Sequence, residues 1–214
     1  MLITLKAKLV TAPKPPFVGT RIGIALDDPG SLTWGIFALT LAEGHAGAVV
    51  DWGDGTCTEL AESGQPTHDY AKAGEYEILI SDDVSSLRCS TKSATSEFRT
   101  VYAPMIREFR TTAAALRAIA DCCFHDATSL RAFQGAATGP HTLGQRAFYN
   151  CKSLSGRLDL PGAGDIASTA FSGCSGITEL HFASANEDAI RASPAWKESG
   201  GRFGAENAAA FFDL

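Results

Sequence analysis

The cysteines, histidines and carboxylates are the side chains of this chain whose types could support a catalytic or metal site. A zinc site takes Cys and His ligands at short fixed spacings, such as a Cys-x-x-Cys pair. No histidine lies in such a spacing, and the adjacent Cys122 and Cys123 point in opposite directions on most backbones. We therefore expect no zinc site. The side chains considered are Cys57, Cys89, Cys122, Cys123, Cys151, Cys174, His45, His68, His125, His141 and His181.

A cysteine nucleophile needs a neighbouring base and an electropositive, partly exposed setting. Cys151 and Cys174 instead fall at repeat positions that face a core, so we interpret the cysteines as buried free thiols and not as disulfides. Nucleophile-elbow, dinucleotide-binding and Walker motifs are absent from the sequence. We expect no enzyme activity, no catalytic residue and no cofactor.

Four aspartates raise the question of a calcium site. Asp51 and Asp54 could join Asp82 or Asp83, since oxygen-rich loops bind calcium. The alternative is that Asp54 forms the Gly53-Asp54-Gly55 turn and that Asp51 is a solvated strand residue. We favour the turn and expect no metal site.

Composition limits the partners of the protein. The 214 residues are 45% apolar, and their net charge is −6. An acidic chain without a basic stripe argues against nucleic-acid binding. No apolar stretch is long enough for a membrane helix, and the first ten residues do not resemble a signal peptide. We expect an extracellular, cell-surface or virion-associated protein that does not insert into a membrane.

A repeat with a period of 23 to 24 residues runs through the C-terminal half, with half-repeats on either side. The aligned segments are IADCCFHDATSLRAF, LGQRAFYNCKSLSGRL and IASTAFSGCSGITEL. Each unit is too small to bury its large apolar side chains alone, so we expect the units to stack in columns. The columns are Ile119, Leu143 and Ile166; Phe124, Phe148 and Phe171; Ala127, Cys151 and Cys174; and Leu130, Leu154 and Ile177.

A strand is expected after each trailing aliphatic residue, and a short helix or turn around each phenylalanine. Apolar and polar residues alternate in RLDLP and ELHFA, which places the polar ones on one open face. One extra residue near Gly156 indicates a bulge or loop. The predicted recognition face consists of Glu108, Arg110, Gln134, Arg157, Asp159, Glu179 and His181, although these could simply be solvated positions.

The motifs AFYNCKSL, AFSGCSGI and CFHDATSL resemble the BspA-like leucine-rich repeats of microbial surface proteins. The resemblance covers residues 101–214 and implies adhesion to host proteins or cells, with no catalytic residue. The last residues look like a cap, in which Trp196 and Phe203 cover the final unit and AAAFFDL forms a closing strand or helix.

The N-terminal half has short apolar runs separated by turn residues, which favours an antiparallel sandwich. Its segments VVDWGDGTCTEL and HDYAKAGEYEILI resemble the polycystic-kidney-disease (PKD) domain, an immunoglobulin-like sandwich. Trp52 is expected in the core and His68 in a structural role. The first 30 residues are left unexplained, apart from an edge strand or an added hairpin, and residues 81–100 are expected to contain the domain junction.

The predicted fold class is a two-domain protein. Residues 1–100 form an immunoglobulin/PKD-like β-sandwich, and residues 101–214 form a leucine-rich-repeat solenoid of about three full repeats with caps. The predicted function is non-enzymatic adhesion or protein recognition, with a protein or glycan ligand on a host or cell surface. The alternatives are a phage virion or tail component and a carbohydrate-binding accessory module.

Overall fold

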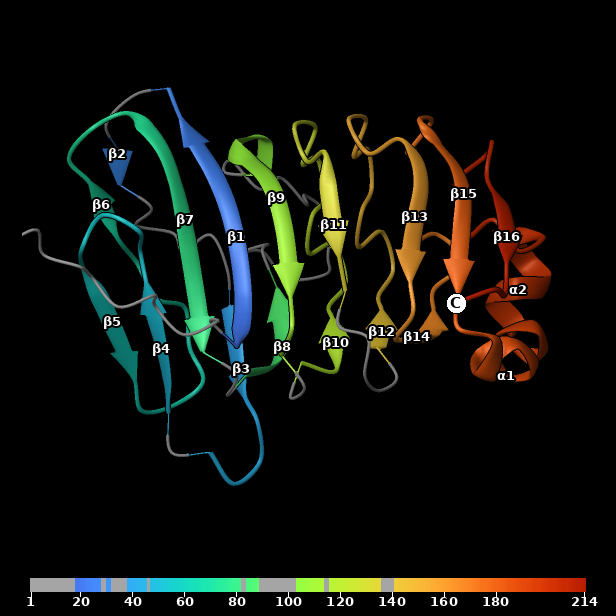
Figure 1. The fold of residues 1–214 in the computed structure, drawn as a ribbon, viewed down its shortest axis with the longest axis horizontal. Coiled ribbons are helices and arrows are strands. Elements are labelled where there is room, and N and C mark those ends of the chain that lie inside the picture. The colour runs from blue at the N-terminus through green and yellow to red at the C-terminus, as the bar shows by residue number, and fades with distance from the viewer. Residues whose placement is uncertain are drawn as a thin grey trace, which may run out of the picture.

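The computed structural model consists mainly of β-strands (Figure 1). The residues that it describes are 18–27, 30–31, 38–45, 47–81, 84–88, 103–113, 116–135 and 141–214. The predicted boundary between residues 100 and 101 lies outside these ranges. So do Asp82, Asp83 and Cys89.

The largest sheet has six strands in the order β11-β9-β1-β7-β4-β5. β1 lies inside this sheet, antiparallel to β7 on one side and to β9 on the other. Its side chains alternate, so that Ile22 and Ile24 are buried and Arg21 lies on the opposite, solvent-facing side. The strands are β1 (Gly19–Leu26), β4 (Ala48–Asp51), β5 (Cys57–Leu60), β7 (Gly74–Ser81), β9 (Ile106–Thr111) and β11 (Ala132–Gln134).

A second sheet has five strands in the order β14-β12-β10-β8-β3. β3 is antiparallel to β8, and the remaining neighbours are parallel. Ile119 pairs with Leu143, and Leu143 with Ile166, so the column of leading aliphatic residues is in register. The strands are β3 (Ala38–Leu41), β8 (Val84–Arg88), β10 (Ala118–Ile119), β12 (His141–Leu143) and β14 (Ala163–Ile166).

Two smaller sheets complete the described part of the fold. β13 (Gly156–Leu160), β15 (Ile177–Phe182) and β16 (Ala209–Phe211) form a parallel sheet, and β2 (Gly30–Ser31) pairs with β6 (Asp69–Tyr70). The helices are short: η1 (Ala103–Met105), η2 (Ser184–Asn186), α1 (Glu187–Ala192) and α2 (Pro194–Ser199). The predicted strands in RLDLP and ELHFA are confirmed as β13 and β15.

The predicted fold class, a separate immunoglobulin/PKD-like sandwich followed by a leucine-rich-repeat solenoid, is wrong. Strands from both halves share the two large sheets: β9 and β11 extend the sheet of β1, β7, β4 and β5, and β10, β12 and β14 extend that of β3 and β8. The protein is instead mostly β, with mixed parallel and antiparallel sheets and little helix. The physical reason is edge pairing. In an isolated N-terminal half, β1 and β8 would each expose an unpaired strand edge, which β9 and β10 cover.

The parallel strands of the repeat also fail to form one continuous sheet. Among the described residues, no backbone hydrogen bond joins β11 to β13, although the two strands lie against each other. Phe133, which packs inward, follows Leu130 by three residues, whereas the inward Leu158 follows Leu154 by four. A slip of one residue turns every side chain to the opposite face. A bulge at Gly156, with φ +70°, shifts the register so that β13 still pairs with β15. On its other side, β13 is not paired with β11.

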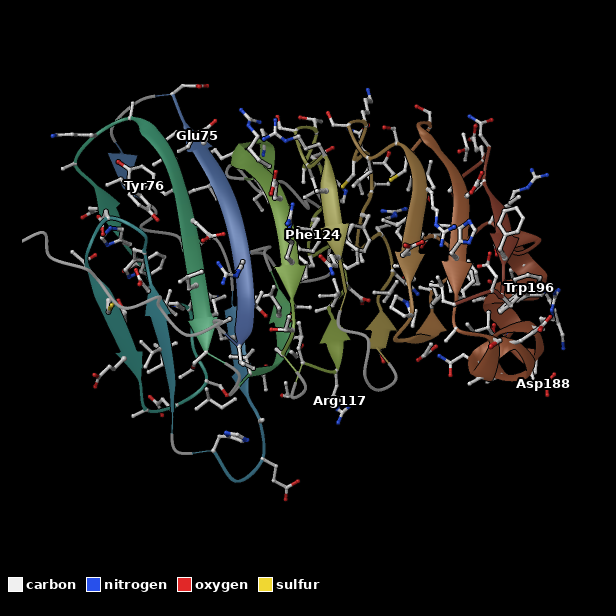
Figure 2. All side chains as sticks on the ribbon, in the orientation of Figure 1. Glu75, Tyr76, Arg117, Phe124, Asp188 and Trp196 are labelled. Carbon is white, nitrogen blue, oxygen red and sulfur yellow. The ribbon has the colours of Figure 1, made fainter. Side chains whose placement is uncertain are left out.

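The predicted stacking of the aromatic column is confirmed. The ring centroids of Phe124 and Phe148 are 5.2 Å apart, and those of Phe148 and Phe171 are 5.1 Å apart, both in stacked geometry. Phe109 continues the column edge-on, 5.2 Å from Phe124. Figure 2 shows Phe124 within the body of the protein. All four rings are fully buried, so the column is the centre of a core shared by both large sheets.

The small column beside the rings is also buried, which confirms the interpretation of Cys151 and Cys174 as core thiols. Cys151 Sγ donates to the carbonyl oxygen of Phe124 at 3.1 Å, and Cys174 Sγ donates to that of Phe148 at 2.9 Å. Each thiol therefore adds a second hydrogen bond to a buried carbonyl of the preceding unit, which already accepts a backbone N–H. Cys57, by contrast, is exposed.

Tight turns surround the phenylalanines, as predicted. Asp126 and Asn150 have positive φ (61° and 59°), and Gly173 occupies the same position in the third unit with φ 78°. These three residue types tolerate the left-handed conformation best. Asn150 Nδ2 also donates to Asp126 Oδ1 at 2.7 Å, so the turn side chains link neighbouring units.

The predicted cap is confirmed at the C-terminal end. Phe203 is fully buried, and its carbonyl accepts a 2.8 Å hydrogen bond from the N–H of Phe171, the last ring of the column. Trp196 of α2 packs edge-on against Phe203, and Figure 2 shows it at the end of the molecule away from β5. β16 is the closing strand.

Phe148→Ala tests the aromatic column. Removing a fully buried ring between two stacked neighbours leaves a cavity, so we expect a loss of about 3–5 kcal/mol in the free energy of unfolding. Urea unfolding followed by circular dichroism measures this loss. Val49→Ala, at an exposed position on β4, is the control and should cost below about 1 kcal/mol. Equal losses in the two variants would contradict the role of the column.

Candidate functional face and groove

The outer face of the long row of strands carries the predicted recognition residues. Phe109 of β9 and Leu158 of β13 point into the core, so the residues directly before and after each of them point outward. β9 supplies Glu108 and Arg110. The rest of the set is Gln134 on β11, Arg157 and Asp159 on β13, and Glu179 and His181 on β15. The structure thus brings the whole set to one face, which Figure 1 shows as the row β7, β1, β9, β11, β13 and β15.

A groove of about 770 Å³ hollows this face where β11 and β13 lie unpaired. Its charged lining consists of Arg110, Arg131, Arg157 and Asp159. Gln134, Thr112 and Ser155 add polar groups, and Phe133, Pro161 and Leu214 add apolar ones. The lining is therefore locally cationic, although the whole chain carries a charge of −6.

Arg131 and the groove itself were not predicted. Arg131 precedes β11, at the corner after Leu130, where strand alternation gives no indication of direction. It is 63% exposed and reaches Glu108 of the neighbouring β9. The signal that could have located the groove is the extra residue near Gly156, which puts β13 out of phase with β11.

Ion pairs of different strength cross the face, and the two to Glu108 are weak. Arg110 and Arg131 share Glu108, at 3.4 and 3.5 Å, whereas strong charge-assisted hydrogen bonds are about 2.7–2.9 Å long. Arg157 donates to Asp159 at 2.6 Å, and this hydrogen bond is the main cause of its raised pKa. Exposed pairs of this kind contribute little to the stability of the fold. The two long pairs to Glu108 can accordingly be exchanged for contacts with a ligand.

His181 departs from the expectation for a solvent-facing residue, because it is only 3% exposed. Its ring stacks on Phe211 of β16, with centroids 4.7 Å apart. Nδ1 lies 2.6 Å from Asp213 Oδ1, and Nε2 lies 2.8 Å from Glu179 Oε2. Burial by itself lowers the pKa of His181, but the hydrogen bonds to Asp213 and Glu179 outweigh it, so the pKa is raised.

The Trp-Gly-Asp-Gly turn and His68 form a structural network at the other end of the protein. Trp52 is 1% exposed and stacks on His68, and Tyr70 donates to the Trp52 carbonyl at 2.8 Å. Asp54 accepts hydrogen bonds from Thr56 and contacts His68 Nε2 at 2.8 Å. Burial alone raises the pKa of Asp54, but these hydrogen bonds outweigh it, so its pKa is lowered. The predicted turn, core and structural roles are confirmed.

The remaining candidates for chemistry are the metal-ligating side chains and the buried cysteines. Across the described ranges, no group of three or more His, Cys, Asp or Glu side chains is arranged to hold a metal ion. The proposed calcium set depends on Asp82 or Asp83, outside those ranges. Burial raises the pKa of Cys151, which opposes the thiolate form that a nucleophile needs. No described helix is long and apolar enough to cross a membrane.

Comparisons with known proteins give no match. No protein-family model matches the chain, and neither curated proteins nor solved structures show a significant similarity to it. The resemblances to PKD domains and to BspA-like repeats therefore stay predictions.

The raised pKa of His181 predicts how the stability of the protein depends on pH. Because its folded-state pKa is raised above the ordinary 6.5, its ion pairs contribute fully to stability below pH 6.5, and the contribution is lost as the pH rises through the folded-state pKa. Urea unfolding between about pH 5.5 and 9 should show the stability difference between the protein and His181→Gln shrinking as the pH rises. His45→Gln, at an exposed loop position, is the control. A difference that grows with pH would contradict this role of His181.

Proposed function

We propose that the protein is a non-enzymatic recognition protein that binds a protein ligand through the outer face of its strands. The groove between β11 and β13 carries this proposal. Its volume of about 770 Å³ lies within the range of about 300–1,000 Å³ that is usual for ligand sites. It also combines charged, polar and apolar groups, as binding sites do.

The rigidity of the face supports the proposal. Glu108, Arg110, Arg157 and Asp159 project from strands, and the strands rest on the buried aromatic column. Side chains on a fixed framework lose less freedom on binding than side chains on loops. The long ion pair between Arg110 and Glu108 leaves charged groups that a partner can engage.

The proposed setting is a host or cell surface, where the protein acts in adhesion. This setting rests on the likeness of the motifs AFYNCKSL and AFSGCSGI to those of surface proteins. The groove argument does not depend on it.

A binding screen of the full chain tests the proposal. Arrayed extracellular-matrix proteins and whole cells are the ligands, and Arg110→Glu/Arg157→Glu is the test variant. Two charge reversals on the face should weaken saturable binding by about tenfold or more, because like charges placed opposite a complementary partner repel it. Biolayer interferometry measures the change.

Arg117→Glu is the control for a single charge reversal. Arg117 is exposed, lies outside the groove and precedes β10 in the five-stranded sheet; Figure 2 shows it pointing away from the strands. Its reversal changes the net charge in the same direction as each test substitution and should leave binding unchanged. Equal weakening in both variants would contradict a site on the outer face. A stable trimer that binds none of the ligands would favour a virion component instead.

A further inference from the structure

We propose that the groove between β11 and β13 binds an extended acidic segment of the partner protein. This inference rests on the proposed function and names the chemistry of the ligand. It is carried by three features of the groove: an excess of arginine, an open strand edge and the absence of a free aromatic platform.

The arginine excess is built into the geometry. Arg110, Arg131 and Arg157 contribute three guanidinium groups to the lining, against one acidic side chain, that of Asp159. Their side chains are 56%, 63% and 48% exposed. A guanidinium carries five N–H donors arranged to match a carboxylate, so these groups have donors to spare for an acidic ligand.

Glu108 competes with the ligand for Arg110 and Arg131. It is the carboxylate that both Arg110 and Arg131 approach, at 3.4 and 3.5 Å. At these distances one glutamate neutralises part of the charge of two arginines and satisfies neither fully. A ligand carboxylate with better geometry would displace it. Removing the negative charge of Glu108 should accordingly strengthen the binding of an acidic ligand.

The second feature is the open edge of β11. The Arg131 N–H donates to the Arg107 carbonyl on the β9 side, at 2.9 Å. β11 is the end strand of the six-stranded sheet and pairs only with β9, so its other edge has no strand partner among the described residues. Backbone groups at such an edge can hydrogen-bond a polar ligand.

The third feature separates a peptide from an acidic glycan. Sugar rings commonly stack on an exposed aromatic ring, but among the described residues Phe133 is the only aromatic one in the groove lining. Its ring is already in contact with Phe109, Phe124 and Phe148. The apolar surface of Pro161 and Leu214 instead suits an aliphatic side chain. The combination favours a segment in which acidic and aliphatic residues alternate.

A second hollow extends the groove toward β1. It has a volume of about 290 Å³ and shares Arg110, Thr112 and Gln134 with the main groove. Arg21, on its far side, pairs with Glu77 at 3.0 Å. Glu77 and Glu108 also line this second hollow and balance its two arginines, so the acidic segment is placed in the main groove.

Fluorescence anisotropy with the full chain tests the inference. The probe is a labelled peptide of about eight residues, roughly 26 Å long when extended, in which glutamate alternates with valine. Peptides with lysine or glutamine in place of glutamate are the charge controls, and a glucuronate-containing oligosaccharide is the glycan control. We expect saturable binding of the glutamate peptide alone, weakening as salt is raised.

Two substitutions are expected to change peptide binding in opposite directions. Arg131→Glu should weaken peptide binding by about tenfold or more, and Glu108→Gln should strengthen it severalfold. Arg117→Glu, outside the groove, should change nothing. Thermal unfolding followed by circular dichroism checks that each variant is folded, so that a loss of structure is not counted as a loss of the site.

Three outcomes would overturn the inference: equal binding of the lysine peptide, unchanged binding by Arg131→Glu, or weaker binding by Glu108→Gln. Preferential binding of the oligosaccharide would also overturn it. If the face variants lose a protein ligand in the binding screen but the acidic peptide does not bind, the proposed function stands and only this inference fails. If the peptide binds in the groove but no protein ligand is found, the site stands and adhesion fails.

Discussion

The stacking of Phe109, Phe124, Phe148 and Phe171 is the constraint on which the rest of the structure depends. Stacked and edge-on rings at about 5 Å fix the distance between successive units, and the small residues beside them let the backbone turn tightly. Large apolar side chains each contribute roughly 1.5–3 kcal/mol when buried. The inner columns therefore stay in register even where the strands outside them do not.

The groove forms because the core columns keep their register while the outer strands do not. The aromatic column and the leading aliphatic column keep their spacing through the second unit, whereas the outer strand of that unit contains one extra residue at Gly156. If β13 had kept the phase of β11, Leu158 would face solvent and Arg157 would face the core. The bulge restores the burial of Leu158 at the expense of pairing with β11. The hollow in the outer face is thus a consequence of keeping the core closed, and it leaves arginines on both of its sides.

The repeat columns, the turn residues and the outward direction of Arg157 and Asp159 could be predicted, because they depend on local periodicity. The pairing of β1 with β9 could not, because it joins strands about 90 residues apart and carries no periodic signal. This pairing is why the two-domain interpretation failed. The burial of His181 escaped prediction for a similar reason, since it depends on where β16 lies. Glu108 was placed on the correct face, but its sharing between two arginines depends on the position of Arg131 across the β9–β11 pair.

The charge distribution explains how an acidic chain could select an acidic partner. A net charge of −6 repels anions at long range, but this repulsion is screened beyond about 8–10 Å at ordinary ionic strength. Within the groove, Arg110, Arg131 and Arg157 act at contact distance, where screening is weak. Glu108 and Asp159 then set a threshold, since a ligand must offer carboxylates in better geometry than theirs to gain from displacing them. For the proposed ligand, this arrangement favours carboxylates that are spaced to reach the arginines over the same charge spread diffusely.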